Sequence, residues 1–199
     1  PRLAKPYYRI SLIIRAWHRA RQAAEAPETL HNAKLVVLRG GADDQSWQDL
    51  ATLKEELGED SIIFVDRTLA AEEMASLYSA CEAMVMLPKT DLLASSLIEG
   101  MACGCFPILA DLPCYRSAIR DVSSPPRADR GAGIFLREPT EEAAADALRR
   151  WGAMNPDERE ICKDLNIEYC RHEHDWEKCA EKIFKAYEIA RDRFRSRRQ

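Results

Sequence analysis

The chain has 199 residues, of which 46% are hydrophobic and 31% are charged, and its formal net charge is −4. This length and composition suit one soluble α/β domain with its own core. The negative net charge argues against a nucleic-acid-binding body. No apolar run approaches the roughly 20 residues that a membrane-spanning helix needs. Because the chain opens without a methionine and without a secretory signal, we expect a cytoplasmic piece of a longer protein.

The cysteine pattern fits a reducing compartment. Seven is an odd number, and four of the cysteines stand in apolar helical or strand contexts: Cys81, Cys103, Cys105 and Cys162. We therefore expect buried thiols and not a disulfide framework.

The apolar pattern predicts helices and short strands in alternation along the chain. The predicted strands cover residues 34–38, 61–65, 83–87, 106–110 and 133–136. The predicted helices cover 12–24 with Ser11 as the cap, a Trp47-containing segment that ends near 57, 72–79, a short helix closed by Gly104, 115–121, and a helix from the cap Thr140 to 152; two more begin at 156 and 174.

Short apolar strands that alternate with helices predict an α/β fold, a Rossmann-like doubly wound parallel sheet with C-terminal helices, in one domain over residues 1–199. Ligands of such sheets bind outside the carboxyl ends of the strands. The Gly40-Gly41 turn and the loop at Asp91 lie at that edge. No Gly-x-Gly-x-x-Gly pattern follows Gly40, so a plain turn is expected there.

The most informative stretch is 91–110, where a loop leads into a short helix and then a strand. The small residues Ala94, Ser95 and Ser96 permit close approach to the backbone, and the N-terminus of the helix favours an anion such as a phosphate. Glu99 lies one turn further on the same face. A phosphate site with a carboxylate beside it suits a nucleotide, because the carboxylate can accept hydrogen bonds from both ribose hydroxyls.

This stretch resembles the donor-binding motif of the family 4 (group 1) glycosyltransferases, which have the two-domain GT-B fold. In that motif an acidic residue, seven intervening residues and a glutamate precede Ala-Met-Ala-x-Gly-x-Pro-Val-Ile. Here Asp91 and Glu99 hold the spacing, followed by Gly-Met-Ala-Cys-Gly-Cys-Phe-Pro-Ile over residues 100–108. The resemblance covers nearly the whole chain and implies the C-terminal, donor-binding half of such an enzyme.

The resemblance implies further contacts with a nucleotide-sugar donor. Arg2 matches the arginine of the basic pair that grips the diphosphate, while the lysine of that pair corresponds to Lys5 or Arg9, or by counting back from Leu12 to Tyr8. The Arg67-Thr68-Leu69 turn would touch the nucleobase, mainly through its backbone. The segment from Asp175 to Ala180 resembles the Trp-Glu-x-x-Ala start of a last helix that packs towards the N-terminal half.

The implied activity is transfer of the sugar with retention of configuration and without an obligatory metal or other cofactor. Arg2 and Asp91 are the expected catalytic residues; the expected donor-binding residues are Arg2, Lys5, Thr68, Asp91, Ala94, Ser95, Ser96 and Glu99. The acceptor, a carbohydrate, a lipid-linked or another hydroxyl compound, would be held mostly by the absent N-terminal domain.

The chain departs from the family pattern in the loop that contacts the transferred sugar. Asp91 replaces a glutamate, Leu92-Leu93 replace a glycine and an aromatic residue, and Gly100 replaces an alanine. These departures leave open a degenerate, non-catalytic binding or scaffold domain. An epimerase-like or phosphorylase-like GT-B enzyme is a further alternative, which the Ala-Met-Ala-like segment disfavours.

Simpler roles remain open for single residues. Glu99 could be a solvated helix acid, Asp91 a cap for the helix after it, and Arg2 a frayed-terminus arginine. The Cys170, His172, His174 and Cys179 set fits no standard zinc spacing, so no metal site is expected. A basic stripe near the C-terminus could touch anionic lipid on the cytoplasmic face of a membrane or be a solvated tail: Arg191, Arg193, Arg195, Arg197 and Arg198.

Overall fold

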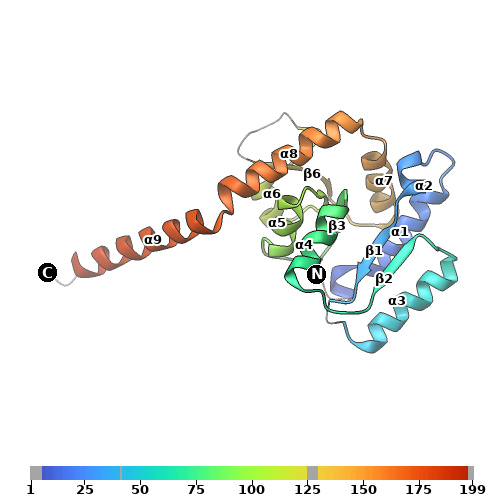
Figure 1. The fold of residues 1–199 in the computed structure, drawn as a ribbon, viewed down its shortest axis with the longest axis horizontal. Helices are drawn as coiled ribbons and strands as arrows, with labels where there is room; N and C mark the ends of the chain where they lie inside the picture. Colours follow the sequence, from blue (N-terminus) through green and yellow to red (C-terminus); the bar gives the residue numbers. More distant parts are fainter. Residues whose placement is uncertain (1–5, 41, 125–129, 197–199) are drawn as a thin grey trace.

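The structure, a computed structural model, describes residues 6–40, 42–124 and 130–196, in which strands and helices alternate (Figure 1). The strands are β1 (Leu35–Leu38), β2 (Ile62–Val65), β3 (Ala83–Met86), β4 (Phe106–Ala110), β5 (Ile119–Asp121) and β6 (Gly131–Leu136). The helices are the 3-10 helix η1 (Pro6–Tyr8), α1 (Ile10–Gln22), α2 (Glu28–Asn32), α3 (Asp44–Leu57), α4 (Ala71–Ala80), α5 (Ser95–Ala102), α6 (Pro113–Ala118), α7 (Glu141–Gly152), α8 (Pro156–Glu173) and α9 (Trp176–Ser196).

The strands pair in parallel and form two sheets. β1 pairs with β2, and the other four have the order β3-β4-β6-β5. The predicted parallel α/β fold with C-terminal helices is confirmed. The hydrogen bonding among the described residues differs from the expected single sheet, because it divides the strands into these two groups.

The central strand β4 has a different cluster of apolar side chains on each of its faces. Phe106, Ile108 and Ala110 belong to a cluster with residues of α1, α3 and α7. Leu109 belongs to a second cluster with residues of α5, α6 and α8. Because successive residues of a strand point to opposite faces, helices cover the sheet on both sides.

Three local predictions differ from the structure. The helix expected to reach Asp121 ends at Ala118, because Ile119 is extended and buried and pairs with Gly131 of β6. The helix expected to be capped by Ser11 begins at Ile10 instead, and its N-cap is Arg9 in the left-handed conformation, with φ 55°. The short helix α2 was not predicted; its five residues are too few to show a helical period.

The seven cysteines are free thiols, as expected. Cys105 and Cys162 are buried, whereas Cys81 and Cys103 are only partly buried. Burial raises the pKa of Cys105 to about 12, and the nearby thiols of Cys81 and Cys103 add to this effect. The Cys105 side chain therefore stays protonated and donates to the carbonyl of Tyr78 at 3.1 Å.

Asn166 of α8 is fully buried and completes the hydrogen bonding of β6. Its Oδ1 accepts from the N–H of Ala132 at 2.6 Å, and its Nδ2 donates to the carbonyl of the same residue at 3.1 Å. The ladder between β4 and β6 begins only at Ile134, so this amide takes the place of a neighbouring strand. Gly131 leaves the necessary room, since a Cβ there would lie 2.7 Å from Asn166 Oδ1.

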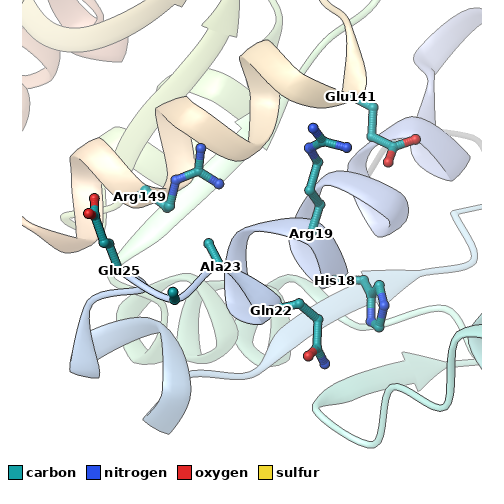
Figure 2. Close-up of a pocket in the computed structure, with 8 residues that line it drawn as sticks. His18, Arg19, Gln22, Ala23, Glu25, Glu141 and Arg149 are labelled. Atoms are coloured by element: carbon teal, nitrogen blue, oxygen red, sulfur yellow. The ribbon is translucent and has the colours of Figure 1, made fainter.

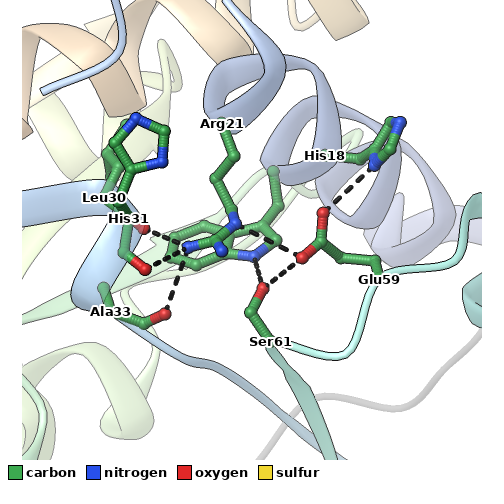
Figure 3. A network of polar contacts seen from close by, with 8 residues as sticks. His18, Arg21, Leu30, His31, Ala33, Glu59 and Ser61 are labelled. Atoms are coloured by element: carbon green, nitrogen blue, oxygen red, sulfur yellow. Dashed lines mark hydrogen bonds and ion pairs between the residues drawn. The ribbon is translucent and has the colours of Figure 1, made fainter. Parts of the chain in front are cut away.

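A buried charge network joins α1 to the turn between α3 and β2 (Figure 3). Glu59 is only 6% exposed. Its Oε2 lies 3.1 Å from His18 Nδ1, and its Oε1 lies 3.3 Å from Arg21 Nε. The hydroxyl of Ser61 donates to Oε1 at 2.5 Å and accepts from Trp17 Nε1 at 2.8 Å.

The same arginine ties α2 into this network. Arg21 Nη1 donates to the carbonyls of Leu30, His31 and Ala33. Burial by itself raises the pKa of Glu59, but hydrogen bonds from Ser61 and His18 and the charge of Arg21 outweigh it, so the pKa lies below its usual value. Glu59 is therefore a carboxylate at neutral pH and holds α1, α2 and β2 together.

The last helix, α9, extends away from the rest of the described chain (Figure 1). Its large apolar residues are exposed, and those at three- and four-residue spacing share one side of the helix: Trp176, Ile183, Phe184, Tyr187 and Phe194. The expected start near His174 is two residues too early. Within the described part of the chain, none of the helices combines the length and the apolar composition needed to cross a bilayer.

Replacing Asn166 by aspartate tests its role as a substitute strand. A carboxylate cannot donate to the carbonyl of Ala132, so we expect Asn166→Asp to lower the free energy of unfolding by about 1–3 kcal/mol. Urea denaturation measures the change. Asp164→Asn on the exposed side of the same helix is the control and should change stability by less than about 0.5 kcal/mol. Equal stability of Asn166→Asp and the wild type would contradict this role.

Replacing Glu59 by glutamine tests the buried charge. We expect Glu59→Gln to lower the free energy of unfolding at neutral pH by about 1–3 kcal/mol. Since the pKa of Glu59 is lower in the folded chain than the ordinary value of 4.5, its stabilisation is complete above that value and is lost as the pH falls through the folded-state pKa. The difference between variant and wild type, measured in urea over a pH series, should therefore shrink towards acid.

The exposed Glu56→Gln is the matched control for the glutamate experiment, since it removes the same charge from the end of α3. It should show no comparable difference at neutral pH. A Glu59→Gln difference that stays constant into the acid range would show that the carboxylate charge is not what stabilises the turn.

Candidate functional site

The loop between β3 and α5 and the first turn of α5 lie at the carboxyl edge of the four-stranded sheet. Because the strands are parallel, the carboxyl ends of β3, β4 and β6 meet at this edge. Asp91 stands in the loop, Ala94 is the N-cap of α5, and Ser95 begins the helix. The structure therefore brings together the predicted residues of the 91–99 stretch.

The start of α5 presents N–H groups that the helix itself cannot satisfy. The carbonyl of Ala94 accepts from Leu97 N at 3.0 Å and from Ile98 N at 3.3 Å. The N–H groups of Ser95 and Ser96 precede this pattern and belong to the orphan donors of a helix N-terminus. Ser95 is exposed and Ser96 is half-buried. Together with the helix dipole, these donors favour an anion.

The other end of α5 is closed as predicted. Gly104 has φ +92°, its N–H donates to Met101 O at 3.0 Å, and Cys105 N donates to Gly100 O at 2.9 Å. Gly100, where the family has an alanine, is explained by β3: a Cβ there would lie 2.6 Å from the sulfur of Met84. The Met84 side chain occupies the space that the methyl group of an alanine at position 100 would need.

Glu99 is exposed and lies one helical turn after Ser95. Within the described residues, no hydrogen bond or ion pair engages its carboxylate. Tyr78 of α4 is close enough to feel its charge. The pKa of Tyr78 is raised to about 12, mainly because the phenol is buried and next because the Glu99 carboxylate is nearby. The carboxylate therefore lies beside α4 and is accessible to a ligand.

Asp91 is half-buried and joins the loop to α6. Its Oδ2 accepts from the hydroxyl of Tyr115 at 2.5 Å, and its Oδ1 accepts from the N–H of Leu92 at 2.9 Å. Tyr115 is completely buried, whereas Leu92 is 83% exposed. The carboxylate is thus directed by α6 although the loop beside it is open to solvent.

The other side of the loop rests on the segment between η1 and α1. Lys89 N donates to Tyr7 O at 3.1 Å, and the hydroxyl of Tyr7 donates to Thr90 O. Arg9 Nη1 donates to the carbonyls of residues 87 and 88 at 3.0 and 3.2 Å. Arg9, an alternative for the family's lysine, therefore supports the loop backbone in this structure.

An arginine anchors α6 to the ends of β4 and β6. Arg116 donates through Nε and Nη2 to the carboxylate of Asp111 at 2.5 and 2.9 Å. Its guanidinium lies 4.0 Å from the ring centre of Phe135. The hydrogen bonds from Arg116 outweigh burial and hold the pKa of Asp111 below its usual value. The start of α6 is therefore fixed by a charged pair at neutral pH.

The predicted nucleobase turn follows β2, and Thr68 within it is exposed. Arg67 Nη1 and Nη2 donate to the carboxylate of Glu73 at 2.9 and 2.7 Å. The same carboxylate accepts from Ala70 N at 2.9 Å. These two contacts, Arg67 first, lower the pKa of Glu73 to about 2. The backbone around Thr68 is thus held on the N-terminus of α4.

The remaining predicted residues can be placed only in part. Arg2 and Lys5 lie outside the described residues. Tyr8 is half-buried and packs edge-on against Tyr7, with ring centres 5.1 Å apart. Among the residues that the structure describes, no three His, Cys, Asp or Glu side chains gather in a way that could hold a metal ion.

Two hollows formed by the described residues lie away from this edge. One, of about 670 Å³, lies between α1 and α7 and is lined by polar side chains from both, including His18, Arg19 and Arg149 (Figure 2). The other, of about 280 Å³, lies at the start of β3 and β4 and includes Cys81 and Cys103. Neither includes a residue of the 91–99 stretch.

Sequence reasoning missed the groups that hold the loop. Tyr115 is 24 residues from Asp91, and Tyr7 is 83 residues from Thr90. Two tyrosines in apolar surroundings carry no local pattern that marks them as hydrogen-bond partners of a distant loop. The only sequence signal was the shorter side chain of Asp91, which leaves space that another residue can fill.

Comparison with known proteins gives one family. The family model described as Glycosyl transferases group 1 matches residues 2–169. No curated protein matches the chain.

Several solved structures share the fold at low sequence identity. Anabaena Alr3699/HepE in complex with UDP-glucose superposes with a TM-score of 0.71 at 11% identity, over 93% of this chain and 46% of that one. Sucrose-phosphate synthase from Thermosynechococcus elongatus superposes with a TM-score of 0.72 at 19% identity, over 94% of this chain and 43% of that one. The catalytic domain of starch synthase IV from Arabidopsis thaliana, bound to ADP and acarbose, superposes with a TM-score of 0.69 at 13% identity, over 93% of this chain and 36% of that one. The chain thus spans less than half the length of these structures.

Proposed function

Since the chain belongs to the group 1 glycosyl transferases, we propose that it binds a nucleotide-diphosphate sugar and, with the N-terminal half of a GT-B enzyme, transfers the sugar to an acceptor. The observation that carries the proposal is the start of α5 at the carboxyl edge, where helix N–H groups and the accessible carboxylate of Glu99 stand one turn apart. This pairing suits a diphosphate joined to a ribose.

Each part of the donor has a proposed partner. The N–H groups near Ala94 to Ser96 bind the diphosphate, and Glu99 accepts hydrogen bonds from the ribose hydroxyls. The backbone at Thr68 contacts the base. Asp91 orients the sugar. By the family pattern, Arg2 with Lys5 neutralises the charge on the diphosphate.

The proposed step is electrostatic and needs no metal. As the bond between sugar and diphosphate breaks, negative charge develops on the departing diphosphate. The N–H donors of α5 and the guanidinium of Arg2 stabilise that charge, which is the largest contribution in many such reactions. The acceptor oxygen forms the new bond to the sugar with retention of configuration, and the proton of its hydroxyl passes to the departing diphosphate.

The acceptor is proposed to bind mostly to the N-terminal half. We expect it to be a carbohydrate, a lipid-linked compound or another compound with a hydroxyl group. The exposed apolar side of α9, which includes Trp176, Phe184 and Tyr187, is the proposed surface on which that half docks, because so large an exposed apolar side is uncommon on a lone domain.

The cytoplasm is the proposed location, since seven free thiols suit a reducing compartment. Arg191 and Arg193 of α9 belong to the basic stripe proposed to touch anionic lipid on the cytoplasmic face of a membrane. Arg195, Arg197 and Arg198 complete that stripe in the sequence.

Calorimetric titration of the chain with UDP, GDP and ADP tests the donor site. We expect one nucleotide to bind and Glu99→Ala to weaken it by about 1–3 kcal/mol, the cost of losing a charged hydrogen-bond partner. UDP is the first choice, because a structure with the same fold was solved with UDP-glucose.

The matched control is Glu72→Ala, which removes an exposed carboxylate from α4 and should leave the affinity unchanged. Binding that Glu99→Ala does not weaken would contradict the ribose assignment. If none of the three nucleotides binds, the donor-site proposal itself is contradicted.

A further inference from the structure

The contact between Tyr115 and Asp91 points to a further role within the proposed donor site, on whose function this inference rests. We propose that Tyr115 is a positioning residue, which holds the carboxylate of Asp91 in place for the sugar of the donor. Tyr115 reaches Asp91 from α6, 24 residues along the chain, with its hydroxyl 2.5 Å from Oδ2.

The ring of Tyr115 is fixed by the apolar core. It is 0% exposed and belongs to the second cluster with Leu97 and Met101 of α5 and Leu109 of β4. Close packing leaves such a ring few alternative positions. The hydroxyl is therefore held at the edge of the core, where it donates to the half-buried Asp91.

The helix that carries Tyr115 is fixed as well. The next residue, Arg116, forms two hydrogen bonds with Asp111 and stacks over Phe135. Together they connect α6 to the ends of β4 and β6. Tyr115 thus moves with the sheet and not with the exposed loop.

The backbone that carries Asp91 is supported from the opposite side. Tyr7 and Arg9 form four hydrogen bonds with residues 87–90, immediately before Asp91. The fixed backbone of residues 87–90 on one side and the hydroxyl of Tyr115 on the other leave the Asp91 carboxylate little freedom. The rigid support matters because a displacement of about 1 Å at a reacting centre costs on the order of a hundredfold in rate.

The short side chain explains why support is needed at this position. Asp91 has one methylene fewer than glutamate, so its carboxylate cannot reach as far towards the sugar. The hydrogen bond from Tyr115 sets the direction of Oδ2, while the N–H of the exposed Leu92 donates to the other oxygen, Oδ1. The geometry therefore assigns sugar recognition to Tyr115 and Asp91 acting together.

Titration of Tyr115→Phe with UDP and with UDP-glucose separates positioning from folding. The variant keeps the buried ring and loses only the hydroxyl, so UDP should bind within about twofold of the wild type. We expect the ratio of the dissociation constants of UDP-glucose and UDP to rise about tenfold, as for the loss of a charge-assisted hydrogen bond. If the wild type prefers another nucleotide, that nucleotide and its glucose conjugate replace this pair.

Tyr169→Phe is the matched control. Tyr169 belongs to the same cluster, is 7% exposed, and places its hydroxyl 3.2 Å from His174 Nε2, far along the chain from the loop. It should leave the ratio unchanged. An unchanged ratio in Tyr115→Phe, or an equal rise in Tyr169→Phe, would overturn the positioning role while the donor site stands. A wild type that binds no nucleotide would instead overturn the proposed function, and this role with it.

A double variant tests whether Tyr115 acts through Asp91, which a general loss of stability in Tyr115→Phe would not imitate. If Tyr115 acts only through Asp91, Asp91→Asn with Tyr115→Phe should raise the ratio no further than Asp91→Asn alone. Additive effects of the two substitutions would overturn the proposal. Urea denaturation of each variant confirms that the compared proteins are folded.

Discussion

Burial of β4 on both faces is the constraint on which the rest of the structure depends. Phe106, Ile108 and Ala110 need one apolar layer, and Leu109 needs another. Because a parallel strand between two others can meet this need only with helices on both sides, the chain must cross the sheet repeatedly. The same geometry collects the loops after β3, β4 and β6 at one edge, so the candidate site follows from how the core is buried.

The polar groups of that edge are mostly engaged with one another. Arg116 is paired with Asp111, and Asp91 accepts from Tyr115. These pairs hold loops in position, whereas the carboxylate of Glu99 stands beside them without such a partner among the described residues. The candidate site therefore combines a rigid frame with an accessible carboxylate, an arrangement that lowers the cost of ordering on binding.

The fold was largely predictable because its signals are local. Alternating apolar runs and helical periods place most helices and strands, and Gly104 marks the end of α5 through its positive φ. The segment Ile119–Asp121 was not predictable, since its extended form depends on pairing with Gly131 of β6. Asn166 likewise reads as an ordinary helix residue until β6 provides the partner that requires it.

The sequence by itself determined the fold class, the carboxyl-edge position of the 91–99 stretch and its chemistry of helix N–H groups and carboxylates, because each depends on residue spacing along one segment. Only the tertiary structure decided which groups support that chemistry. Tyr115, Tyr7 and Arg9 reach the loop from 24 to 83 residues away. A hydrogen bond needs two groups within about 3 Å, and no local pattern states which distant residue folding will bring to that distance.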